Sequence, residues 1–209
     1  MEKESRQTRL RLLLKKLNVQ RKTQARKIDI LCNDLISAHR EFINRLDTIS
    51  FAARFYESIL AAGELSSLLP RAGKLIEEQI PDANIAFFLR QPDGFELHLH
   101  QSEQPISLDT QSLENSFTTE LVENICKSNK VCKLEDLYAM GLQGNLTALN
   151  KVSVATIPLS RHGCSLGFIL IYRSRQRELK QAELINIAAV TAGLCKAITA
   201  CQTVSGSTE

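Results

Sequence analysis

The 209-residue sequence has no tryptophan and only short apolar runs. The longest are residues 85–89 and 168–172, well below the roughly 18 residues that a membrane-spanning helix requires. Three leucines at 12–14 end at two lysines, so the basic N-terminus lacks the apolar stretch of about 7–15 residues found in a secretory signal. These absences predict a cytoplasmic protein that is not an integral membrane protein.

Several motifs of catalytic and metal sites are also missing. The six cysteines form no Cys-x-x-Cys pair, and a Gly-Lys pair at 73–74 lacks the other residues of a phosphate-binding loop. No Gly-x-Ser-x-Gly elbow is present. His98 and His100 share one strand face with Glu96, but two imidazoles do not complete a metal site. We expect reduced cysteines, no metal and no catalytic residue, and the identity of any cofactor is left open by the sequence.

Charge is spread unevenly along the chain. Residues 1–30 hold ten basic and three acidic residues, a net charge of +7, whereas the remainder holds 16 basic and 20 acidic residues, a net charge of −4. A basic arm of this kind is typical of contact with nucleic acid, an anionic membrane surface or an acidic protein. A solvated helix face is the alternative, since the arm contains no aromatic residue for base stacking. The predicted anion-binding residues are Arg11, Lys15, Lys16, Arg21, Lys22, Arg26 and Lys27.

The first sixty residues have the periodicity of a long helix. Apolar residues recur at alternating steps of three and four, as in the core positions of a coiled coil, with Arg21 and Gln24 at two intervening positions. At Phe42 two four-residue steps follow one another, which is a stutter in the coiled-coil pattern. The apolar pattern then continues to Ala53, Tyr56 and Leu60. We expect this seam to pair with a second chain, and an intrachain hairpin is the alternative. The predicted seam residues are Leu10, Leu14, Leu17, Ile28, Leu31, Leu35, Phe42, Leu46 and Ile49.

The remaining chain mixes strand and helix patterns. An order with adjacent hairpins favours an α+β domain with an antiparallel sheet flanked by helices. We divide the chain into a basic coiled-coil helix (1–49), an α+β domain (50–202) and a disordered tail (203–209). A polar connection with four basic residues is expected at 173–180. Helices are expected at 66–80, 113–128 and 179–200, and strands at 83–90, 95–101, 130–134, 152–159 and 167–172.

The body resembles a GAF domain, a small sensory fold of signalling proteins. The similarity is carried by a strand that ends in apolar-Pro-Leu (154–159), by the turn and strand at 163–172, and by the final helix around 181–198. It covers about residues 50–201. The resemblance implies a small-molecule pocket between the sheet and its covering loops, and dimers formed through flanking helices.

The resemblance also suggests where a ligand would bind. The loop at 137–150 would roof the pocket, with Tyr138 and Asn145 as polar contacts, and Phe88 and Thr156 would form its walls on the sheet. The alternative is a sheet face filled by its own side chains, as in GAF domains that serve only for dimerisation.

Three functions follow from these patterns. The first is a dimeric, non-catalytic regulatory or signalling protein that binds a small molecule or a partner protein. The second is an adaptor whose basic helix docks on nucleic acid or an acidic protein. The third is a GAF-type methionine sulfoxide reductase, for which Cys126, Cys132 and Cys164 would be the thiols.

Overall fold

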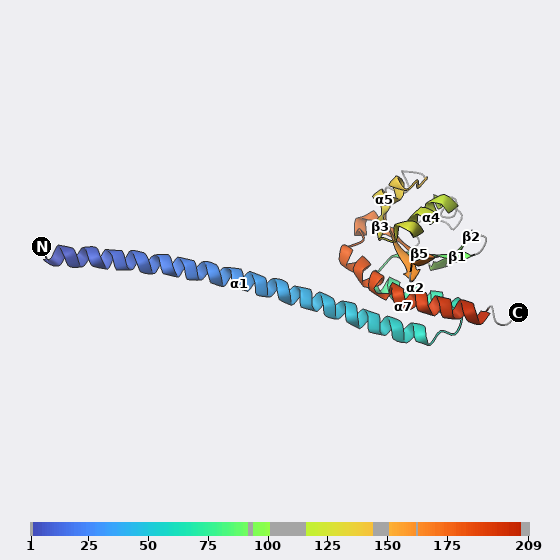
Figure 1. Ribbon diagram of the computed structural model, residues 1–209, viewed down its shortest axis with the longest axis horizontal. Helices are drawn as coiled ribbons and strands as arrows, with labels where there is room; N and C mark the ends of the chain where they lie inside the picture. Colours follow the sequence, from blue (N-terminus) through green and yellow to red (C-terminus); the bar gives the residue numbers. More distant parts are fainter. Residues whose placement is uncertain (1, 92–93, 101–115, 144–150, 162, 206–209) are drawn as a thin grey trace. The chain divides into compact units, whose positions relative to one another are not determined.

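The computed structural model describes residues 2–91, 94–100, 116–143, 151–161 and 163–205 (Figure 1). The chain divides into two compact units, Met1–Asp47 and Thr48–Glu209. The boundary between the two units falls inside the long N-terminal helix.

The first unit is helical throughout its described length. It belongs to α1, which covers Glu2–Leu60. Neither glycine nor proline occurs in residues 1–60, so nothing in this stretch interrupts the hydrogen-bonded backbone. The predicted seam residues are all exposed within the single chain. An ion pair between Arg45 and Glu41, one turn apart, supports the exposed surface of the helix.

The second unit begins with the last turns of α1, which have a buried face. Phe51, Phe55 and Ile59 pack into the domain core. Tyr56 also lies against α7 (Gln181–Ser205): its hydroxyl donates to the carbonyl of Ala189 over 3.2 Å. The periodicity predicted that Tyr56 continues the intermolecular seam, and this prediction is wrong. Gly193 has no side chain, which leaves room for the ring on the chain's own helix.

The sheet has five strands in the order β2-β1-β5-β4-β3, and every neighbouring pair is antiparallel. This confirms the predicted α+β class. The strands are β1 (Asn84–Gln91), β2 (Gly94–His100), β3 (Cys132–Lys133), β4 (Val152–Arg161) and β5 (Cys164–Ser174).

Helices cover both faces of the sheet (Figure 1). α2 (Leu65–Gln79) and α7 pack on the face that carries Ile85, Phe87 and Leu89, and the last turns of α1 contribute to the same core. α4 (Thr119–Ser128) and α5 (Leu134–Ala139) pack on the face that carries Ala86 and Phe88. The two cores follow from the alternation of side chains along each central strand.

α7 is apolar enough to pass a length and hydropathy test for a membrane span over Gln181–Thr203. A core helix of a soluble protein passes the same test, and the packing of α7 fits that explanation. Leu184, Ile187, Val190 and Leu194 are buried against the sheet and its neighbouring helices. The domain core therefore accounts for the buried residues of α7, which make up 39% of an apolar 18-residue stretch of this helix.

Several element boundaries differ from the expected ones. α4 begins at Thr119, where the hydroxyl of Thr118 accepts a hydrogen bond from the amide of Leu121 and caps the helix. The expected strand at 130–134 is reduced to Cys132–Lys133, because α5 begins directly after it. Residues 203–205 are helical rather than part of a disordered tail, since Cys201 keeps the last turn of α7 packed on the core. Residues 206–209 lie outside the described part of the chain.

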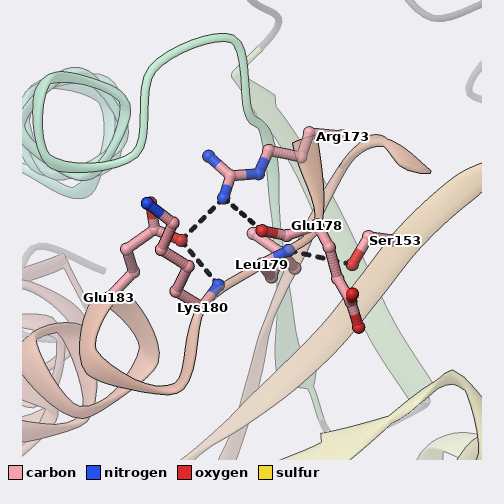
Figure 2. A network of polar contacts seen from close by, with 6 residues as sticks. All are labelled: Ser153, Arg173, Glu178, Leu179, Lys180 and Glu183. Atoms are coloured by element: carbon pink, nitrogen blue, oxygen red, sulfur yellow. Dashed lines mark hydrogen bonds and ion pairs between the residues drawn. The ribbon is translucent and has the colours of Figure 1, made fainter. Parts of the chain in front are cut away.

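Arg173 is a buried residue of β5 near the start of α7, although the sequence pattern predicted that it begins a polar connection. Its Nη2 donates to the carboxylate of Glu183 and to the carbonyl of Glu178, each over 2.7 Å (Figure 2). The same carboxylate accepts from the amide of Lys180, which satisfies a free N–H at the start of α7. The amide of Leu179 donates to the hydroxyl of Ser153 on β4. This network fixes the start of α7 on the sheet.

Candidate functional site

The sheet face beneath α4 and α5 holds the residues expected to bind a ligand. Strand register places Cys132, Thr156, Leu170 and Ala86 in one row across β3, β4, β5 and β1. Both Ala86 and Cys132 are small, so this row has a lower profile than a row of branched or aromatic side chains. α5 packs over its outer end against β3 and β4.

Two hydroxyl groups on this side of the sheet are buried without a hydrogen-bond partner among the described residues. They are Oγ1 of Thr156, whose residue is 0% exposed, and the hydroxyl of Tyr138 on α5. A buried hydroxyl that forms no hydrogen bond costs about 1–3 kcal/mol. Such groups in native proteins are normally satisfied by protein, by ordered water or by a ligand.

Phe88 lies apart from these hydroxyls. Its ring stacks on Phe168 with the centroids 4.7 Å apart and the planes at 13°, and Phe117 packs against both rings. β5 separates Phe88 on β1 from Thr156 on β4. The aromatic cluster of Phe88, Phe117 and Phe168 therefore fills one end of the face, and Thr156 lies in the adjacent row.

Only two of the four predicted site residues lie on elements that pack against each other among the described residues. Tyr138 and Thr156 belong to packed neighbours, α5 and β4, whereas Phe88 belongs to the aromatic cluster. Asn145 lies outside the described residues. Tyr138 is on a short helix rather than in the expected loop, because Leu137 is buried and anchors α5 on the sheet.

A hollow of about 420 Å³ lies beside the C-terminal half of α4 and the turn between β4 and β5. Cys126 and Cys164 both line it, together with the charged residues Arg90, Glu123 and Lys127 and several polar residues. Cys132 lines no part of this hollow; its thiol contacts the carbonyl of Lys130 and the hydroxyl of Ser128. The three cysteines considered for a reductase are therefore not all gathered at this hollow. The sequence did not predict this hollow. The only pattern near it is the turn around Cys164, and a turn by itself indicates only a reversal of the chain.

The electrostatic surroundings of the thiols differ. Burial raises the pKa of Cys126, although a hydrogen bond with Ser165 and the charge of Arg90 act in the opposite direction. Burial also raises the pKa of Cys195 to about 11. Cys32 and Cys164 are exposed. A high pKa keeps a thiol protonated at neutral pH and weakens it as a nucleophile.

The paired histidines of β2 each contact a carboxylate. Nε2 of His98 lies 3.2 Å from Oε1 of Glu96, and Nε2 of His100 lies 2.9 Å from Oε2 of Glu77 on α2. His100 also covers Gly73, where a Cβ atom would lie 2.7 Å from the histidine side chain. Within the described residues no group of three or more His, Cys, Asp or Glu side chains could hold a metal ion.

Neither family models nor curated proteins provide a match to the sequence. Solved structures do match. The GAF domain of a phosphoenolpyruvate-protein phosphotransferase from Coxiella burnetii has a TM-score of 0.56 at 16% identity, covering 77% of this chain and 98% of that one. A free methionine-R-sulfoxide reductase from Neisseria meningitidis, solved with its substrate, has a TM-score of 0.55 at 12% identity, covering 75% of this chain and 91% of that one.

A methyl-accepting chemotaxis protein fragment also matches, with a TM-score of 0.53 at 13% identity, covering 72% of this chain and 98% of that one. At these identities the similarity concerns the fold, which serves different functions in different proteins. The strand order, the antiparallel pairing and the helices on both faces agree with it. The chain therefore has a GAF-like fold.

Proposed function

We propose that the chain is a non-catalytic regulatory protein whose GAF-like unit binds a small molecule beneath α4 and α5. The observation that carries this proposal is the pair of buried hydroxyls of Thr156 and Tyr138, which find no partner among the described residues. A ligand with polar atoms at this place would satisfy them. Signalling-type neighbours of the same fold agree with a sensory role.

The surroundings of the two hydroxyls indicate the chemistry of the ligand. The buried side chains that pack around them are apolar or aromatic. Among the described residues, the only buried charged side chain is that of Arg173, which pairs with Glu183 at the start of α7. Burying a charged ligand group there would cost more than it gains, because no opposite charge is at hand. The ligand is therefore a neutral, largely apolar molecule with hydrogen-bonding atoms at one end.

We further propose that α1 pairs with the same helix of a second copy. The seam residues expose large apolar side chains, and Leu31 and Leu35 are 66% and 69% exposed. Pairing through core positions of a coiled coil would remove this surface from water. The paired helices would set the spacing of two sensory domains in a cytoplasmic dimer.

A reductase is less well supported than a sensor. Burial raises the pKa of Cys126, and Cys132 lies apart from the hollow that Cys126 and Cys164 share. A thiol attack on a sulfoxide needs a thiolate that is accessible to the substrate. Methionine sulfoxide reduction that is abolished by Cys164→Ser would overturn the non-catalytic assignment.

The ligand proposal is tested with two isosteric substitutions and one control. Native mass spectrometry of the freshly purified full chain should find a discrete added mass on each subunit. Thr156→Val and Tyr138→Phe each remove one of the two hydroxyls and should reduce this mass. Thr199→Val is the matched control, since the Thr199 hydroxyl already donates to the carbonyl of Cys195 over 2.8 Å.

The unfolding free energy of the ligand-free protein gives an independent readout. Thr156→Val should stabilise it by about 1 kcal/mol, because an unpaired buried hydroxyl is removed without loss of volume. A wild-type chain with no added mass, together with a destabilised Thr156→Val variant, would show that the hydroxyl serves the free protein and would contradict the ligand proposal.

A further inference from the structure

The N-terminal helix contains a long basic stretch without any acidic residue. From residue 5 to residue 28 there are nine lysines and arginines, bounded by Glu4 and Asp29. At 1.5 Å per residue this stretch covers roughly 36 Å of helix. Ordinary solvated helices alternate charges of both signs, which stabilise one another one turn apart. Nine cations without a counter-charge repel one another and are relieved by an external polyanion.

Four of these cations form a stripe along one side of α1. Arg11, Lys15, Lys22 and Arg26 are separated by steps of 4, 7 and 4 residues, and all four are exposed. With 3.6 residues per turn, they lie within a sector of roughly 60° and extend over about 22 Å. We call these four residues the basic stripe.

The basic stripe is separate from the apolar seam. Leu10, Leu14 and Leu17 lie roughly 90–150° around the helix from the stripe's centre. In heptad terms Lys15, Lys22 and Arg26 occupy b and f positions, which a two-stranded coiled coil leaves open to solvent, and Arg11 occupies an e position at the edge of the core. A dimer formed through the seam therefore keeps the basic stripe of each chain available.

We infer that the basic stripe binds the phosphate backbone of double-stranded nucleic acid without reading its sequence. A duplex presents one negative charge per roughly 1.7 Å of axis, a linear array to which a straight row of cations is complementary. The first aromatic residue of the chain is Phe42, so the basic stretch offers no ring for stacking single-stranded bases. The stretch likewise lacks the aromatic anchors common in helices that lie in a membrane interface.

The salt dependence of binding has a definite expected size. Four phosphate contacts predict a slope of log affinity against log salt of about −3.6, and each lost contact reduces it by about 0.9. Between 50 and 200 mM salt the affinity should then fall about 150-fold. Two stripes that engage one duplex would steepen the slope.

The experiment is a fluorescence anisotropy titration of the full chain with a labelled 24-base-pair duplex of arbitrary sequence at several salt concentrations. The test variant replaces all four stripe residues by glutamine, which has a helix propensity similar to that of lysine and arginine. The control variant carries Arg71→Gln, Lys74→Gln, Lys130→Gln and Lys180→Gln, which removes the same charge from exposed positions of the second unit. Circular dichroism checks that all three proteins have the same helix content.

We expect wild type and control to bind with the steep salt slope, and the stripe variant to lose most of the slope and at least tenfold in affinity at 50 mM salt. Equal binding by the stripe and control variants would overturn the proposal. Tighter binding to single-stranded oligothymidine, or to vesicles of phosphatidylserine and phosphatidylcholine, would also overturn it. The vesicle arm matters because exposed Leu12 and Val19 flank the stripe.

Discussion

Arg173 and Glu183 form a buried ion pair that joins β5 to the first turn of α7. Nη2 of Arg173 lies 2.7 Å from Oε2 of Glu183, and the two side chains are 6% and 18% exposed. A second hydrogen bond from the same nitrogen reaches the carbonyl of Glu178. Because α7 covers one face of the sheet, this pair connects the helix to the core that it completes.

Removing the arginine should destabilise the domain. Arg173→Gln leaves the buried carboxylate without its cation, and breaking a buried pair in this way costs about 3 kcal/mol. Urea unfolding followed by circular dichroism measures the change. The matched control is Arg177→Gln, whose exposed pair with Asp82 is worth at most about 1 kcal/mol. Equal losses for the two variants would show that burial of the Arg173 pair has no special effect.

The stability of the domain should fall in alkaline solution. Burial raises the pKa of Cys195 to about 11, so the folded state holds this proton at pH values where the unfolded chain releases it. The contribution of this thiol to the free energy of unfolding is therefore fully present below the ordinary thiol pKa, and it is lost as the pH rises toward 11. Cys195→Ala should reduce the fall in unfolding free energy between pH 8 and pH 11 by about 2 kcal/mol. If the unfolding free energies of the wild type and of Cys195→Ala fell by the same amount over this pH range, the role of Cys195 would be contradicted.

Burial should also determine which cysteines react with an alkylating reagent first. At pH 7.5, iodoacetamide should label the exposed Cys32 and Cys164 well before Cys126, whose pKa is raised by burial. Peptide mass spectrometry over a time course measures each rate, and labelling in urea provides the unprotected reference. Cys126 reacting as fast as Cys164 would indicate an accessible, activated thiol and would favour the reductase.

The contact between Tyr56 and Gly193 should depend on the missing side chain. A Cβ atom at Gly193 would lie 2.0 Å from the tyrosine ring, so Gly193→Ala should destabilise the domain by about 1–2 kcal/mol, despite the better helix propensity of alanine. Gly63→Ala is the control, since nothing lies within 4 Å of its added Cβ atom. The double variant with Tyr56→Ala should lose less than the sum of the two single variants. Strict additivity would mean that the two residues do not interact.

Much of the fold could be predicted from alternation and turn residues. The hairpin of β1 and β2, the apolar strand β5 and the long helices all have clear periodic patterns. The ends of the elements could not be predicted, because tertiary contacts set them: β3 is short since α5 begins at once, and Tyr56 turns to α7 because Gly193 leaves room. The burial of Arg173 could not be predicted either, since its acceptors come together only when β5 and α7 meet.

The candidate site was predictable only through the resemblance. Thr156 lies on a strand whose pattern shows which face it occupies, and the structure adds that its hydroxyl is buried without a partner among the described residues. No local pattern distinguishes Phe88, a residue of the aromatic cluster, from a residue that lines an open pocket. The stacking geometry with Phe168 depends on the pairing of β1 with β5, which connects residues about eighty positions apart.

Pairing of two copies through α1 is the central claim, and subunit number tests it most directly. Native mass spectrometry should give twice the chain mass of 23.4 kDa for the wild type. Leu17→Asp with Leu31→Asp places charge in the seam and should give single chains, whereas Leu12→Asp with Ile30→Asp changes exposed residues outside the seam and should leave the dimer intact. A wild-type mass of 23.4 kDa at micromolar concentration, or a seam variant that remains dimeric, would contradict the account.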